Sequence, residues 1–78
     1  MFTLYSKDAC PGCRTALAMI KASGTSTVVV KKLDEDYTLA ELRALIPGVK
    51  SVPQVFHDRE HIGGVRELQA YLAKLNGH

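Results

Sequence analysis

Two cysteines separated by only two residues constrain this chain more than any other feature of its sequence. They are the ends of a Cys-Pro-Gly-Cys segment at residues 10–13, which follows closely after the strand-like run at residues 2–5. Proline suits the first position of a helix, because its missing N–H would have no partner there. Pro11 therefore predicts a helix that begins at the motif, with Cys10 at its N-cap.

The segments after the motif predict a β-α-β unit. Ala16, Leu17 and Ile20 stand at helical spacing and give the helix an inward face, and Gly24 favours its end. Residues 25–33 contain three consecutive valines, which predict a buried strand. A strand, a helix and a second strand in this order favour parallel pairing of the two strands.

The second half of the chain predicts another helix, a hairpin and a last helix. Residues 38–41 have the form of a capping box, and a Pro-Gly pair at 47–48 favours the end of that helix. Residues 54–57 and 60–62 predict two short strands joined by a two-residue turn. The last helix follows two glycines and carries on one face Val65, Leu68, Leu72 and Leu75. The predicted fold class is α/β, with the order β-α-β-α-β-β-α.

Size and charge limit the classes of protein to which the chain can belong. Its 78 residues, of which 46% are hydrophobic and 23% charged, predict a single globular domain over residues 1–78. The net charge is +2 and the charges are scattered, so we expect no nucleic-acid surface. No apolar run approaches the roughly 18 residues that span a bilayer. Since the start lacks a signal-peptide pattern, we expect a cytoplasmic protein without membrane partners.

The two sulfurs are suited to thiol–disulfide exchange. Such a dithiol needs one sulfur that ionises readily and a second that attacks the mixed disulfide formed by the first. At the N-cap, Cys10 would face main-chain N–H groups and the positive end of the helix dipole, and Lys7 would add a positive charge nearby. Thiols in such settings have pKa values lowered from about 8.5 to roughly 3.5–7.5. We therefore assign Cys10 as the attacking thiolate and Cys13 as the less exposed, resolving thiol.

The residues between the cysteines shape the space around them. Pro11 restricts the backbone and Gly12 adds little bulk, so we expect an open pocket beside Cys10. A reducing compartment keeps ordinary thiols reduced, which makes a structural disulfide the weaker interpretation. An external thiol would therefore have to reduce the Cys10–Cys13 disulfide after each cycle.

Zinc binding is an alternative use of the same cysteines. His57 and His61 complete a nominal set of two cysteines and two histidines. Residues 14–56 separate the cysteines from His57, whereas compact zinc fingers have about 12 to 15 residues in that interval. A closed zinc site would also bury both thiols. We therefore expect no metal, and we expect both histidines on the surface of the last hairpin.

Three segments of the sequence resemble glutaredoxins. They are the strand that leads through Lys7 into residues 10–13, the Ser-Val-Pro-Gln-Val-Phe segment at residues 51–56, and the His-Ile-Gly-Gly segment at residues 61–64. The spacing between these segments also matches the family, and together the segments span nearly the whole chain. The resemblance implies a thioredoxin fold, which is a four-stranded mixed sheet with three helices. It further implies a glutathione-dependent thiol–disulfide oxidoreductase.

The resemblance also implies how substrates are bound. A cis peptide bond before Pro53 would turn its loop toward the cysteines and expose the backbone N–H and C=O of Val52 to an extended substrate. Lys7 would contact a carboxylate of glutathione, and Pro11 and Gly12 would border the same site. The other end of glutathione would contact Gly64, Val65 and Arg66. Glutathione would be a reducing co-substrate, with no tightly bound cofactor.

Two positions depart from the family pattern. Many dithiol glutaredoxins carry tyrosine where this chain has Gly12, so one wall of the glutathione groove is missing. Many carry a small polar or acidic residue just after the paired glycines, where this chain has Val65, Arg66 and Glu67. Arg66 would repel the ammonium group of glutathione. A thioredoxin-like reductant, recharged by thioredoxin reductase, therefore remains an alternative.

Partners follow from the same resemblance. Besides glutathione they would be disulfide-containing proteins, ribonucleotide reductase among them, and we expect the chain to be a monomer. Arg14, Lys50 and Arg66 would form a positive rim that attracts acidic substrates. A bridging iron–sulfur cluster, held by Cys10 and glutathione from two protomers, is a further alternative, with which the disulfide chemistry of Cys13 would compete.

Overall fold

The fold consists of four strands and three helices in a computed structural model that describes residues 1–24 and 27–76. In chain order these are β1 (Phe2–Ser6), α1 (Pro11–Ala22), β2 (Val28–Lys32), α2 (Leu39–Leu45), β3 (Gln54–His57), β4 (Glu60–Gly63) and α3 (Val65–Asn76). The predicted order β-α-β-α-β-β-α is confirmed. Among the described residues, no helix is both long enough and apolar enough to cross a membrane.

The strands form one mixed sheet in the order β2-β1-β3-β4. β1 and β2 are parallel, with Phe2 beside Val28 and Ser6 beside Lys32. β3 is antiparallel to β1, and β4 is antiparallel to β3. Because a parallel pair cannot be joined by a tight turn, α1 makes the connection between β1 and β2. The β-α-β unit and the four-stranded mixed sheet are thus both confirmed.

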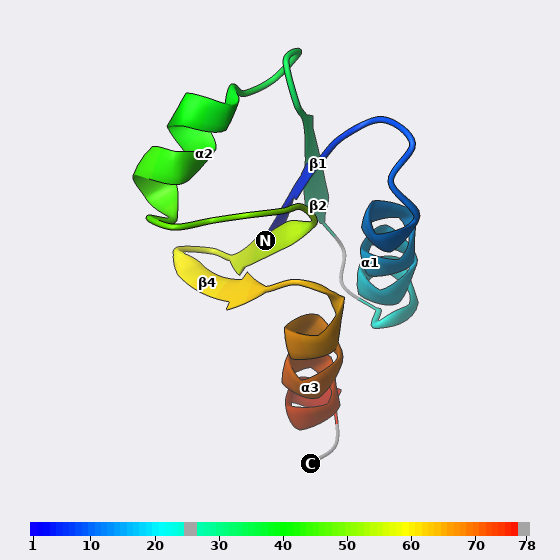
Figure 1. The fold of residues 1–78 in the computed structure, drawn as a ribbon. Helices are drawn as coiled ribbons and strands as arrows, with labels where there is room; N and C mark the ends of the chain where they lie inside the picture. The colour runs from blue at the N-terminus through cyan, green and yellow to red at the C-terminus, as the bar shows by residue number, and fades with distance from the viewer. Residues whose placement is uncertain (25–26, 77–78) are drawn as a thin grey trace.

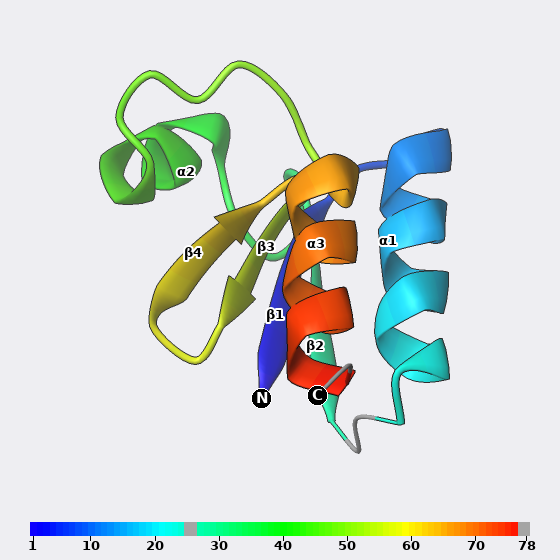
Figure 2. The ribbon, with the colours of Figure 1, turned by 90° about the horizontal axis from the view of Figure 1, so that it is seen from below.

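The three helices cover the two faces of the sheet unequally. Figures 1 and 2 show α1 and α3 on one face and α2 alone on the other. The larger core packs the sheet against α1 and α3, and its buried residues are Phe2, Leu4, Ala16, Ile20, Val55, Leu68 and Leu72. The smaller core, on the α2 side, contains Tyr5, Tyr37 and Leu42. Leu4 and Tyr5 belong to different cores because successive strand residues point to opposite faces of a sheet.

β2 is an edge strand, and the prediction that its valines are buried is wrong. In the described sheet it pairs only with β1, and Val29 and Val30 are 37% and 42% exposed. A β-branched run favours a strand but does not determine whether a second strand lies beside it. The strand is also shorter than the predicted range 25–33, of which residues 25 and 26 lie outside the described part of the chain.

Capping atoms fix where the first two helices begin. The Thr38 side chain accepts a hydrogen bond from the Glu41 N–H, and the Glu41 carboxylate accepts one from the Thr38 N–H, which confirms the predicted capping box. At the start of α1 the capping atom is a sulfur, because Cys10 is the N-cap residue and its Sγ accepts from the Cys13 N–H. The first cysteine is therefore placed by the same kind of local interaction that begins α2.

Candidate active site at the start of the first helix

Cys10 and Cys13 form a disulfide across the first turn of α1, with their Cα atoms 5.2 Å apart. The main-chain N–H of Cys13 donates a hydrogen bond of 3.2 Å to Cys10 Sγ. Both residues are buried in this oxidised form, with 7% of Cys10 and 5% of Cys13 exposed. The expected difference in exposure between the two cysteines is therefore small in the disulfide. The arrangement provides two sulfurs close enough to form a disulfide within one turn of helix.

The loop from β1 into α1 is held to the end of β2 by an ion pair. Lys32 Nζ lies 2.8 Å from Asp8 Oδ1 and 2.9 Å from Glu35 Oε2. The hydrogen bond to Asp8, followed by the one to Glu35, raises the pKa of Lys32. Lys32 is thus shared by two carboxylates and offsets part of the negative charge that Asp8 brings near Cys10. Sequence reasoning missed this pair, because no short-range spacing rule connects residues on different elements.

The loop that precedes β3 also reaches Cys10. The peptide bond between Val52 and Pro53 is cis, as the resemblance implies. The carbonyl oxygen of Val52 lies 4.0 Å from Cys10 Sγ. Both loop residues are only half-buried, so part of this loop remains accessible next to the sulfur. The fold therefore brings together Cys10 and a backbone segment that lies far from it in the sequence.

Gly12 packs against the same loop. A Cβ atom at this position would lie 3.2 Å from Pro53 Cδ and 3.9 Å from Val65 Cγ2. The space on this side of Gly12 is therefore limited by Pro53, which a Cβ atom would crowd. The absence of a side chain at Gly12 allows the Cys-Pro-Gly-Cys motif to pack closely against this loop.

The start of α3 is capped by the side chain of Glu67, a residue in its first turn. The Gly64 N–H donates a hydrogen bond of 2.9 Å to Glu67 Oε1, which is one half of a capping box. Gly63 has a φ of 124°, and a Cβ there would lie 2.9 Å from both Cβ and Cγ of Glu67. Val65 is half-buried and Arg66 is exposed. Sequence reasoning missed this cap, although the N-cap-to-N3 spacing of Gly64 and Glu67 is a signal that predicts it.

A pocket of about 250 Å³ lies beside the disulfide, between the β1–α1 loop, α1 and β2. It is lined by both cysteines together with polar loop residues and apolar core residues, namely Leu4, Ser6, Lys7, Asp8, Ala9, Cys10, Cys13, Arg14, Leu17 and Val30. Lys7 and Arg14 are exposed and form no ion pair within the described residues. The expected pocket beside Cys10 therefore exists, and Lys7 lines it whereas Gly12 does not.

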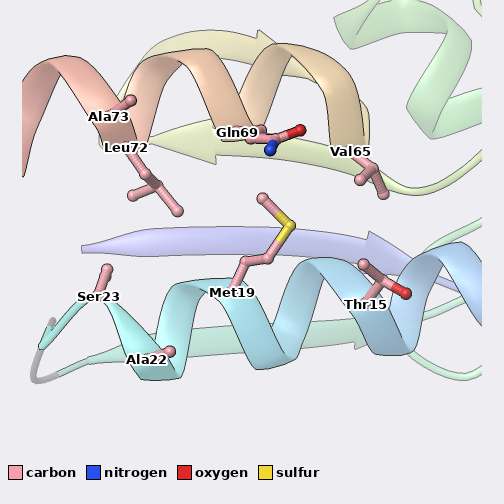
Figure 3. Close-up of a pocket in the computed structure, with 8 residues that line it drawn as sticks. All are labelled: Thr15, Met19, Ala22, Ser23, Val65, Gln69, Leu72 and Ala73. Carbon is pink, nitrogen blue, oxygen red and sulfur yellow. The ribbon is translucent and has the colours of Figure 1, made fainter.

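A larger groove, of about 520 Å³, lies between α1 and α3 (Figure 3). Figure 3 shows Met19 pointing from α1 across the gap toward α3. The lining residues are Thr15, Met19, Ala22, Ser23, Val65, Gln69, Leu72 and Ala73. None of these side chains is a thiol or a group that titrates near neutral pH, so this groove supplies no redox chemistry.

The histidines are placed away from the cysteines. His57 stacks on Phe2, with ring centroids 4.3 Å apart, and its Nδ1 lies 2.5 Å from Tyr71 Oη. His61 Nε2 lies 2.8 Å from Gln54 Oε1. The expected surface position is confirmed for His61 and wrong for His57, which is half-buried by these ring contacts. Over residues 1–24 and 27–76, no three cysteine, histidine or acidic residues gather in a way that could hold a metal.

Comparisons with known proteins agree with this site. The family model described as glutaredoxin matches residues 2–62. Glutaredoxin 3 of Escherichia coli K12 is 36% identical over 73 residues, which covers 91% of this chain and 84% of that protein. Reduced Escherichia coli glutaredoxin is similar in structure, with a TM-score of 0.80 and 25% identity, covering 96% of this chain and 94% of that one.

One further structure shares the fold and contains a ligand. It is a complex of buckwheat glutaredoxin with glutathione, with a TM-score of 0.76, covering 97% of this chain and 69% of that one. Its sequence is 24% identical to this chain, so the likeness establishes the shared fold.

Proposed function

Because the chain belongs to the glutaredoxin family and is a thiol–disulfide oxidoreductase, we propose that it reduces protein disulfides and glutathione mixed disulfides with glutathione as reductant. The observation that carries this proposal is the Cys10–Cys13 disulfide at the start of α1. Once the disulfide is reduced, the Cys13 N–H and the positive end of the helix would stabilise negative charge on Cys10 Sγ. Cys10 is then the nucleophile.

In the proposed cycle, the Cys10 thiolate attacks one sulfur of a substrate disulfide and forms a mixed disulfide. The other substrate sulfur leaves as a thiolate and takes up a proton. Cys13 then gives up its proton and attacks Cys10 Sγ, which releases the second substrate sulfur. The substrate has gained two electrons and two protons, and the protein holds the Cys10–Cys13 disulfide. Two glutathione molecules restore the dithiol and leave as glutathione disulfide.

Residues around Cys10 would hold the substrate. The Val52 carbonyl, 4.0 Å from Cys10 Sγ, would accept a hydrogen bond from an extended substrate backbone. Lys7 would bind a carboxylate of glutathione, since it is exposed and has no ion pair among the described residues. The other proposed contacts are Pro11, Gly12, Pro53, Gly64, Val65 and Arg66.

The electron source has two candidates. Glutathione is favoured by family membership and by the buckwheat glutaredoxin, which was solved in complex with it. Thioredoxin reductase is favoured by the start of α3, where the Gly64 N–H is already bonded to Glu67 and Arg66 would repel the ammonium group of glutathione. We put glutathione first because the proposed Lys7 and Val52 contacts do not depend on α3.

The proposed setting is the cytoplasm, where residues 1–78 would act as one monomeric domain. A reducing compartment supplies the thiols that reopen the Cys10–Cys13 disulfide after each turnover. Ribonucleotide reductase is one protein substrate that this activity would serve, because its catalytic cycle leaves a disulfide.

A coupled assay tests the proposal. The protein is given the mixed disulfide of cysteine and glutathione, together with glutathione, glutathione reductase and NADPH, and NADPH oxidation is followed by absorbance. In a parallel assay, thioredoxin reductase replaces both glutathione and its reductase. Turnover in the first assay supports the glutathione-linked function. Turnover in the second alone would assign the chain to thioredoxin-like reductants, and the absence of turnover in both would contradict the proposed chemistry.

A further inference from the structure

We propose that the pocket beside the disulfide binds an acidic side chain that neighbours the reacting cysteine of a protein substrate, and that Arg14 determines this preference. The inference rests on the proposed function, because it concerns the substrates that Cys10 attacks. It adds a side-chain contact to the backbone contact proposed at Val52.

The pocket carries an excess of positive charge. Three of its lining residues are charged, namely Lys7, Asp8 and Arg14. Asp8 already pairs with Lys32 Nζ at 2.8 Å, whereas neither Lys7 nor Arg14 has a carboxylate partner in the described chain. A carboxylate that entered the pocket would meet two unpaired cations and would form charge-assisted hydrogen bonds with them. An additional ammonium group would be repelled there.

The position of Arg14 sets it apart from the other cations of the predicted positive rim. Arg14 lines the pocket, in contact with the space that also borders Cys10 and Cys13. Lys50 and Arg66 are exposed but are not among the lining residues. Among the cations of the rim, the specific attraction for an acidic group is therefore assigned to Arg14, which acts beside Lys7 in the pocket, while Lys50 and Arg66 contribute only to the general charge of the surface.

The size and the apolar part of the pocket suit a carboxylate on a short aliphatic stem. The volume is about 250 Å³, and Leu4, Leu17 and Val30 supply an apolar wall. The methylene groups of a glutamate would bury against this wall while its carboxylate reaches the cations. A free phosphate or sulfate has no apolar part to use the same wall.

The pocket borders the sulfur to which a substrate cysteine would bond. Cys10 lines the pocket, and its Sγ also lies 4.0 Å from the Val52 carbonyl oxygen. The next residue of the substrate is one Cα step away, about 3.8 Å. Its side chain would therefore lie close enough to enter the pocket.

Matched peptides test the inference. Three peptides differ only in the residue next to their single cysteine, which is glutamate, glutamine or lysine, and each is prepared as its symmetric disulfide. The reduced protein is mixed with each disulfide in the absence of glutathione, and the second-order rate constant is measured from the peptide thiol released. Each rate is divided by the rate of the same disulfide with dithiothreitol, which removes differences in intrinsic reactivity. We expect a glutamate-to-glutamine ratio of about five, the upper end for exposed ion pairs, and a lysine peptide slower than the glutamine peptide.

Substitutions of Arg14 should change this ratio. Arg14→Gln should lower it by at least half, Arg14→Glu should invert it, and Arg14→Lys should keep it above one. Lys21→Gln is the matched control, because Lys21 is exposed on the same helix, carries the same charge and does not line the pocket. Its ratio should equal that of the unaltered protein. Far-ultraviolet circular dichroism confirms that each variant is folded.

The outcomes separate this inference from the proposed function. A ratio near one in the unaltered protein, with all peptides reduced, would overturn the acidic pocket and leave the redox function intact. An equal fall of the ratio in Lys21→Gln and Arg14→Gln would also overturn it, because general charge attraction would then explain the preference. Failure to reduce any peptide disulfide would contradict the proposed function itself.

Discussion

Cys10 Sγ accepts a 3.2 Å hydrogen bond from the main-chain N–H of Cys13. The residue proposed to resolve the mixed disulfide thus also supplies a donor to the proposed nucleophile. Because the donor belongs to the backbone, it remains when the Cys13 side chain is replaced. The role of each cysteine can therefore be tested by substitution, because replacing the Cys13 side chain keeps the N–H that favours the Cys10 thiolate.

Substitution of each cysteine should have a different effect. Cys10→Ser should abolish exchange with every disulfide, because the nucleophile is lost. Cys13→Ser should retain reduction of glutathione mixed disulfides, which needs one sulfur, and should lose the reduction of protein disulfides that depends on a resolving thiol. The coupled NADPH assay measures the first activity, and release of protein thiols measures the second. Residual turnover by Cys10→Ser would show that the role assignment is wrong.

Lys32 should influence the reactivity of Cys10 through Asp8. Removal of the ammonium group in Lys32→Gln leaves two carboxylates, Asp8 at 2.8 Å and Glu35 at 2.9 Å from it in the structure, without their shared partner, and Asp8 is the one that lines the pocket with Cys10. An unbalanced negative charge close to Cys10 disfavours the thiolate, so the reduced variant should react more slowly with a neutral disulfide. The double variant Lys32→Gln, Asp8→Asn should recover the rate, and Lys74→Gln, on α3, serves as the charge-matched control. Stopped-flow measurement of thiol loss gives the rates. No recovery in the double variant would rule out this explanation.

Gly63 and Gly64 should tolerate alanine very differently. Gly63→Ala places a Cβ 2.9 Å from Cβ and Cγ of Glu67 at a φ of 124°, and should lower the free energy of unfolding by about 1–3 kcal/mol. At Gly64 the nearest atoms to a Cβ are Glu67 Oε1 at 3.5 Å and the Pro53 carbonyl oxygen at 3.6 Å. Gly64→Ala should therefore cost less than Gly63→Ala, about 0.5 kcal/mol, because alanine is a poorer N-cap residue than glycine. Urea unfolding compares the two variants, and equal losses would refute the assignment of Gly63 as the strained position.

Tyr37 should stabilise the fold through its hydroxyl group. Its Oη donates a hydrogen bond of 2.7 Å to the carbonyl oxygen of Ser6, and that oxygen also accepts from the Leu33 N–H at 2.9 Å. Tyr37→Phe therefore leaves no acceptor unpaired and should cost about 1 kcal/mol of unfolding free energy at neutral pH. Thermal or urea unfolding measures the difference. A loss of less than about 0.3 kcal/mol would indicate that this bond contributes little to the fold.

The same residue should make stability depend on alkaline pH. Burial, followed by the charge of Asp34, raises the pKa of Tyr37 above its ordinary value of 10.0. The folded state then holds the phenolic proton more tightly than the unfolded state, so this contribution is complete below about pH 10 and is lost as the pH rises through the raised pKa. Unfolding free energies measured between neutral pH and pH 11 should fall more steeply for the unaltered protein than for Tyr37→Phe. Identical slopes would contradict the raised pKa.

Features that depend on neighbours along the chain were predictable from the sequence. The Thr38–Glu41 capping box, the helix start at Pro11 and the N-cap position of Cys10 involve residues within one turn of a helix, so a short window of sequence contains every interacting group. The resemblance to glutaredoxins added the cis Val52–Pro53 bond, which no local rule would have given. The element order and the positions of both cysteines therefore followed from the sequence alone.

Features that depend on contacts between distant segments were decided only by the tertiary structure. Val29 and Val30 are exposed on β2, which is an edge strand of the described sheet. Hydrophobic periodicity does not encode the order of strands, so the sequence could not predict this exposure. Pro53 packs against Gly12, and Lys32 forms an ion pair with Asp8, because the fold brings these distant segments together. The sequence by itself thus determined where the cysteine pair lies, at the start of a helix, while long-range packing determined the charges and the loop that surround it.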